Sequence, residues 1–81
     1  MKVSVLYFGI LREKLRLDRE ELELSTGTTV AALMDSLAER HSLEALGAGR
    51  IRAAVNCEYA DASDTLGEGD EVAVIPPVSG G

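Results

Sequence analysis

The two apolar segments at the beginning and the end of the chain constrain the fold more than any other feature. Residues 3–8 read VSVLYF and residues 71–75 read EVAVI, so both segments alternate like strands. In the first of them both faces are mostly apolar, which is typical of a central strand buried on two sides. Proline cannot donate to a ladder, so Pro76 and Pro77 must stop the second segment. The pattern predicts a mixed sheet with these two strands together at its middle.

Between the two strands lies one strongly periodic helix. Its apolar face contains Val30, Leu33, Met34, Leu37 and Ala38. This spacing is that of one helical face. We expect Thr28 to be the N-cap and the helix to end near His41, with residues 42–49 as a loop or short helical turn.

Shorter elements complete the pattern. Leu11 and Leu15 suit one or two helical turns, and the alternation at residues 21–24 gives a strand with one solvated face. Residues 51–56 give a further strand, and residues 67–70 give a turn. The predicted fold class is α+β, in the β-grasp or ubiquitin-like arrangement. It has a mixed sheet of four to five strands with one long helix across one face.

The chain divides into a domain and a tail. We expect a β-grasp domain over residues 1–75 and an extended, flexible C-terminal tail over residues 76–81.

No apolar run approaches the ~20 residues that span a bilayer, and the apolar start is too short for a signal peptide. A single cysteine, Cys57, agrees with a reducing compartment. These features predict a cytoplasmic protein.

The acidic excess of the chain is confined to its last third. Residues 1–55 contain eight basic and eight acidic side chains, whereas residues 56–81 contain six acidic and no basic ones. Nucleic acid and anionic membranes are poor partners for such a surface. A basic protein surface is a better one, and plain solubility explains the charge equally well.

The side chains offer little chemistry of their own. His41, at the end of the apolar helix face, suits a helix-end or partly buried histidine. Cys57 has no basic neighbour in sequence that would make it reactive, so we interpret it as structural. The chain has too few Cys and His residues for structural zinc. Glu20 and Glu21 lie on a solvated strand with no apolar pocket to shift a pKa. We expect no bound cofactor, no metal and no catalysis by the chain alone.

The tail is the remaining candidate for function. It consists of Pro76, Pro77, Val78, Ser79, Gly80 and Gly81. Proline keeps a segment extended, and six extended residues reach about 20 Å. Glycine has no Cβ, so a narrow channel can close around the last two residues. A terminal carboxylate can attack the α-phosphate of ATP in another enzyme, and a sulfur donor can then displace the adenylate. A featureless tail is the alternative.

Three segments together resemble one known family. They are the ending GEGDEVA…PPVSGG from Gly67 to Gly81, Phe8 with Arg12-Glu13 after the first strand, and Ala54-Val55-Asn56 on the third. The chain resembles the small, sulfur-carrier subunits of molybdopterin synthase along its whole length. The PPVSGG ending is the most specific part. The related thiamine-pathway carriers are typically shorter and lack the segment with Phe8 and Arg12.

The resemblance implies a function and a set of partners. An E1-like enzyme would adenylate Gly81 with ATP, and a sulfur donor protein would convert it to a thiocarboxylate. The tail would thread into the large subunit of molybdopterin synthase, and the sulfur would pass to cyclic pyranopterin monophosphate. Family members usually place two carriers on a central dimer of large subunits. Phe8, Arg12, Tyr59 and Ile75 are candidate partner-binding residues, although Ile75 equally suits the core and Arg12 a local ion pair.

Three alternatives remain open at this stage. The same tail chemistry suits a carrier for thiamine, cysteine or tRNA thiolation. It also suits a ubiquitin-like modifier that forms isopeptide bonds with lysines. A binding module with an idle tail is the third.

Overall fold

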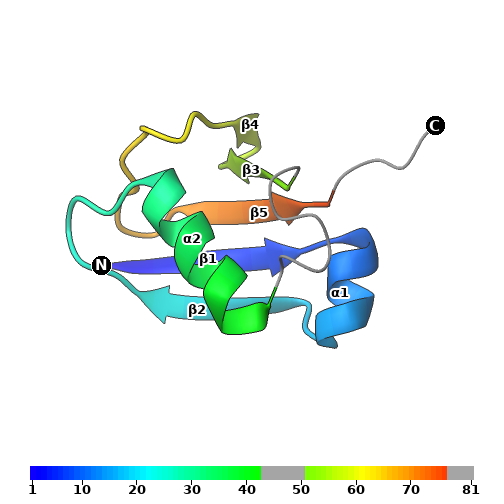
Figure 1. Cartoon of the computed structure of the whole chain (residues 1–81). Helices are drawn as coiled ribbons and strands as arrows, with labels where there is room; N and C mark the ends of the chain where they lie inside the picture. The colour runs from blue at the N-terminus through cyan, green and yellow to red at the C-terminus, as the bar shows by residue number, and fades with distance from the viewer. Residues whose placement is uncertain (43–50, 77–81) are drawn as a thin grey trace.

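The computed structural model describes residues 1–42 and 51–76, which form a mixed five-stranded sheet and two helices (Figure 1). The strand order across the sheet is β2-β1-β5-β3-β4. In chain order the elements are β1 (Lys2–Tyr7), α1 (Gly9–Leu15), β2 (Arg19–Glu23), α2 (Val30–His41), β3 (Arg52–Val55), β4 (Glu58–Tyr59) and β5 (Glu71–Ile75). With α2 lying across one face of the sheet, this is the predicted β-grasp arrangement.

The centre of the sheet is the pair of strands from the two ends of the chain, as predicted. β1 and β5 are parallel, with Val5 opposite Val72 and Tyr7 opposite Val74. These four side chains are at most 1% exposed. They pack against Leu33 and Leu37 of α2, Leu11 of α1 and Leu66 in the long loop before β5.

The face of the sheet opposite α2 differs from the prediction. Burial of β1 on both faces was expected, but Ser4 and Leu6 are only half-buried, whereas Val3 and Val5 are fully buried. The reason is that α2 covers one face alone. The prediction of a central strand is confirmed, and the prediction of burial on two sides is wrong.

Helix α2 begins one residue later than predicted. Thr29 is the N-cap, and its Oγ1 accepts a hydrogen bond from the Ala32 amide at 3.2 Å. Thr28 belongs instead to the preceding turn, where its hydroxyl donates to the Ser25 carbonyl. The helix ends at His41, as predicted, and Ser42 closes it in the left-handed conformation.

A partly buried carboxylate links the end of α2 to the sheet. Glu20 of β2 is 15% exposed, and its Oε2 accepts a 2.5 Å hydrogen bond from the Tyr7 hydroxyl. His41 Nε2 lies 2.9 Å from the same oxygen, and Arg40 Nη1 lies 3.6 Å from Oε1. The prediction that Glu20 is solvated is therefore wrong, whereas the partly buried histidine is confirmed.

The partners of Glu20 decide its protonation. Burial alone raises the pKa of the Glu20 carboxyl. The hydrogen bonds from Tyr7 and His41 outweigh burial, and Arg40 adds to their effect. They hold the pKa of Glu20 below its usual range, so the group is a carboxylate at neutral pH. Burial, and then the hydrogen bond to Glu20, raise the pKa of Tyr7, so its hydroxyl remains a donor.

Neutralising this carboxylate is expected to destabilise the fold. Glu20→Gln loses charge-assisted hydrogen bonds, which should lower the free energy of unfolding by about 1–2 kcal/mol at neutral pH. Glu21→Gln is the matched control, since Glu21 is exposed on the same strand and should change stability by less than about 0.5 kcal/mol. Chemical denaturation of both variants measures the difference.

The difference in stability between wild type and Glu20→Gln should depend on pH. A lowered folded pKa stabilises the protein above the unfolded carboxyl value of about 4.3, and this stabilisation is lost as the pH falls through the folded pKa. The gap between wild type and Glu20→Gln should therefore close in acid. Equal stability of the two Gln variants at neutral pH would contradict the role given to Glu20.

Candidate functional site

The root of the predicted tail lies at the end of β5, beside the junction of β1 and α1. Gly9 opens α1 with a φ of +55°, a left-handed conformation that favours glycine. A Cβ on Gly9 would lie 3.2 Å from Pro76 Cγ, so the proline ring fits closely against this backbone. Pro76 is the last described residue. The other predicted tail residues, Pro77 to Gly81, lie outside the described residues.

The register of the strands defines a surface on the side of the sheet away from α2. Leu6 of β1 lies opposite Ala73 of β5, which lies opposite Ala54 of β3. Ala54 in turn lies opposite Tyr59 of β4. Ile75 lies two residues beyond Ala73 and therefore on the same side. We call these five residues (Leu6, Ala54, Tyr59, Ala73 and Ile75) the open sheet face.

The open sheet face is apolar and accessible. Tyr59 is 69% exposed, Leu6, Ala73 and Ile75 are half-buried, and Ala54 between them is buried. Phe8 is 44% exposed and follows β1 with an extended backbone, so the alternation of the strand places it beyond Leu6 at the edge of this face. Exposed apolar groups gathered in this way are typical of an interaction surface. Ile75, which the sequence also allowed as a core residue, is half-buried on this face and is not part of the fully buried core.

Two residues of the open sheet face, Tyr59 and Ile75, and Phe8 at its edge are among the predicted partner-binding residues, and that role stays a prediction. Leu6, Ala73 and Ala54 were not predicted. The signal was present, because a chain with one long helix cannot cover both apolar faces of its central strands. Arg12, the fourth predicted residue, lies on α1, and its Nε is 3.7 Å from Asp18 Oδ1. Both side chains are more than half exposed, so this local pair leaves Arg12 accessible.

One further charged residue lies on the open sheet face. Arg52 faces Ile75 across the β3–β5 ladder. Its guanidinium lies 5.2 Å from the centre of the Tyr59 ring, within the range of a cation–π contact. This contact holds a cation and an aromatic ring together beside the root of the tail.

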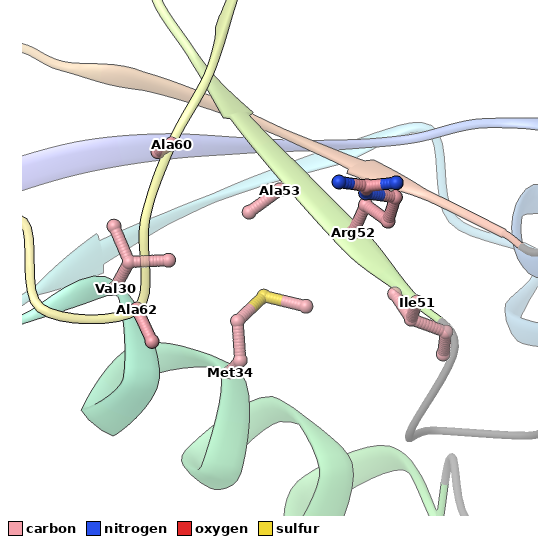
Figure 2. A pocket seen from close by; sticks show the side chains of 7 residues that line it. All are labelled: Val30, Met34, Ile51, Arg52, Ala53, Ala60 and Ala62. Atoms are coloured by element: carbon pink, nitrogen blue, oxygen red, sulfur yellow. The ribbon is translucent and has the colours of Figure 1, made fainter.

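A shallow hollow lies on the other side of the sheet, between α2 and β3 (Figure 2). Its volume is about 550 Å³, and it is lined by Val30, Met34, Ile51, Arg52, Ala53, Ala60 and Ala62. The guanidinium of Arg52 points away from α2, towards the open sheet face (Figure 2). The described lining contains no carboxylate, histidine, cysteine or hydroxyl group. It lacks the groups that acid–base or nucleophilic catalysis requires.

The other candidate groups do not meet in a site. His41 is bound to Glu20, whereas Cys57 is exposed in the tight turn between β3 and β4. Cys57 is not part of the hydrophobic core of the described residues, so the prediction that it is a packed structural residue is wrong. Within residues 1–42 and 51–76, no group of three His, Cys, Asp or Glu residues is placed to hold a metal ion. No helix of these segments is long and apolar enough to cross a lipid bilayer.

Known proteins share this architecture and sequence. The model of the ThiS family matches residues 5–81. The molybdopterin synthase sulfur carrier subunit of Mycobacterium tuberculosis is 45% identical over 82 residues, covering 100% of this chain and 99% of that protein. Small archaeal modifier protein 1 of Haloferax volcanii superposes with a TM-score of 0.83 at 28% identity, over 100% of both chains.

A third relative has been solved as a complex. The complex of subunits 1 and 2 of the molybdopterin-converting factor from Helicobacter pylori contains a chain that is 26% identical, with a TM-score of 0.71 over 100% of both chains. The family model and the full-length relative together cover the fold, the open sheet face and the terminal glycines. This chain belongs to the ThiS family, among the sulfur carrier subunits of molybdopterin synthase.

Proposed function

We propose that this chain carries sulfur for molybdopterin synthesis as a thiocarboxylate on Gly81, in the cytoplasm. The observation that supports it most directly is the extent of the family match, which runs through the final Gly80-Gly81. The described residues add an accessible apolar face beside Pro76. The chain then contributes the sulfur and the docking surface, and the catalytic side chains belong to its partners.

The loading reaction needs two other proteins. In an E1-like enzyme, a carboxylate oxygen of Gly81 attacks the α-phosphorus of ATP, and pyrophosphate leaves. A sulfur nucleophile supplied by a donor protein then attacks the carbonyl carbon of the adenylate, and AMP leaves. ATP is consumed by the activating enzyme and is no cofactor of this chain. Glycine suits this chemistry because no side chain crowds the reacting carbon.

The unloading reaction needs a large subunit. We propose that the open sheet face, with Phe8 and Arg12 at its edge, docks on this subunit while residues 76–81 enter its active site. The sulfur then passes to cyclic pyranopterin monophosphate. The Helicobacter pylori complex of subunits 1 and 2 supports a partner of this kind. Two carriers on a central dimer of large subunits would make the assembly a heterotetramer.

Intact mass spectrometry tests the loading reaction. With ATP, the activating enzyme and a sulfur donor, the mass should rise by the difference between one sulfur and one oxygen atom. Fragmentation should place that change on Gly81. Without the sulfur donor, only an AMP adduct should form. A mass that stays unchanged, while a known carrier is converted in a parallel reaction, would contradict the proposal.

A second candidate is supported by the likeness to an archaeal modifier protein. In that case the activated Gly81 would form an isopeptide bond with a lysine of another protein. The two functions predict different products. A modifier would leave Gly81 attached to lysine side chains in the host proteome, whereas a carrier would be recovered with its sulfur replaced by oxygen.

A further inference from the structure

The charged residues of the described chain are unevenly distributed between the two ends of the molecule. The long loop before β5 lies at the end where β1 begins, and the tail root and α1 lie at the opposite end (Figure 1). The loop and the start of β5 contain the acidic residues Asp61, Asp64, Glu68, Asp70 and Glu71. We call this the acidic end. It holds five of the six carboxylates that make the last third of the sequence negative.

Basic residues gather among the described residues at the end with the tail root. Arg19 lies opposite Leu6, and Arg52 lies opposite Ile75, so both belong to the end of the sheet where β5 stops. The segment from α1 to β2 adds three more cations. Arg12, Lys14, Arg16, Arg19 and Arg52 are all exposed, and we call these five residues at the tail-root end the basic rim. Within the described segment 9–19, two exposed carboxylates, Glu13 and Asp18, accompany four of these cations.

The length of the molecule determines which charge a partner meets. The described chain is 35 Å long in its largest dimension. The Debye length is only about 10 Å at 0.1 M salt, so charges at the acidic end are largely screened from a protein that binds at the tail root. The docking partner therefore meets the basic rim, although the whole chain has a net charge of −6. At this end of the molecule the described charges favour an acidic partner surface, whereas the sequence-based expectation was a basic one.

Some residues of the basic rim have no ion-pair partner among the described residues. Arg12 has Asp18 beside it, and Arg52 stacks on Tyr59. Lys14 and Arg16 form no ion pair with any residue of 1–42 or 51–76. Both are exposed, and the rim adjoins the apolar open sheet face. Apolar surface flanked by charge is the usual anatomy of a protein–protein interface.

We propose that the protein that receives the tail has an acidic rim around its cleft, and that this rim attracts the basic rim of the carrier. The attraction turns the elongated carrier tail-first during its approach. This inference rests on the proposed function, because it concerns the same docking event. We favour a protein as the partner. An anionic nucleic acid would be repelled by Glu13 and Asp18, and it would leave the apolar open sheet face uncovered.

The association rate with the large subunit tests the proposal. Lys14→Gln combined with Arg16→Gln removes two charges from the basic rim without touching the open sheet face. Stopped-flow mixing at low salt should show an association rate about threefold to tenfold below wild type. The dissociation rate should be unchanged, and the two proteins should converge as salt rises towards 1 M.

A matched control separates local charge from net charge. Thr26→Glu combined with Ser63→Glu also lowers the net charge by two, at exposed positions near the acidic end. This control should associate like wild type. Equal rates for the rim variant and wild type, or equal slowing by both variants, would overturn the proposal. If wild type binds no large subunit at all, the proposed function itself fails, and the inference falls with it.

Discussion

A chain that lacks Gly81 is expected to fold normally and to deliver no sulfur. The truncation moves the terminal carboxylate back by one residue, a step of about 3.5 Å along an extended chain. Displacing a reacting group by even about 1 Å can cost a hundredfold in rate. We therefore expect molybdopterin formation with the purified large subunit, the activating enzyme and a sulfur donor to fall below detection.

The truncation also has a clean internal control. The sheet and the core are formed by residues that precede Pro76. The thermal unfolding midpoint and the circular dichroism spectrum should therefore match those of wild type. Addition of one glycine after Gly81 displaces the carboxylate in the other direction and should be equally damaging. Sustained product formation by the truncated chain would rule out a thiocarboxylate on Gly81.

Tyr59→Ala should weaken binding to the large subunit with little effect on folding. A tyrosine at the centre of an interface commonly contributes about 2 kcal/mol, which corresponds to a rise of about thirtyfold in Kd. Tyr59 is 69% exposed in the free chain, so its removal should cost less than about 0.5 kcal/mol of stability. Isothermal titration calorimetry measures the affinity, and chemical denaturation measures the stability.

The variant Tyr59→Phe distinguishes a contact made by the aromatic ring from one made by the hydroxyl group. Tyr59→Phe keeps the ring and its contact with Arg52, so its Kd should stay close to that of wild type. Binding that is unaffected by Tyr59→Ala would place the interface elsewhere than on the open sheet face. Loss of binding in Tyr59→Phe would assign the effect to the hydroxyl group instead of the ring.

The sequence predicts the framework of this fold because local periodicity determines it. The apolar face of α2 repeats at helical spacing, and its end at His41 follows from the loss of that pattern. The central position of β1 and β5 follows from their composition. The N-cap is displaced by one residue because Ser25 and Thr28 form a turn of their own, and two adjacent threonines look alike to a capping rule.

Features that depend on tertiary contacts were beyond the reach of the sequence. Glu20 looks like its neighbour Glu21, and only the fold brings Tyr7 and His41, which are 13 and 21 residues away, onto its carboxylate. The open sheet face is a partial exception: a single long helix signals that one face of the sheet stays uncovered, but alternation alone does not say that this face carries Leu6. The basic rim is invisible in the sequence because Arg52 joins α1 only through the register of β3 and β5.

The parallel pairing of β1 and β5 has a mechanical consequence. β1 begins at one end of the sheet and β5 stops at the other, so a pull on the tail acts along the strands and against the body of the domain. Such a pull loads the hydrogen bonds between the two strands together in shear, instead of opening them one at a time. Resistance to force is governed by the rate of unfolding, which shear geometry keeps low. A partner can therefore draw the tail taut in its cleft without unravelling the carrier.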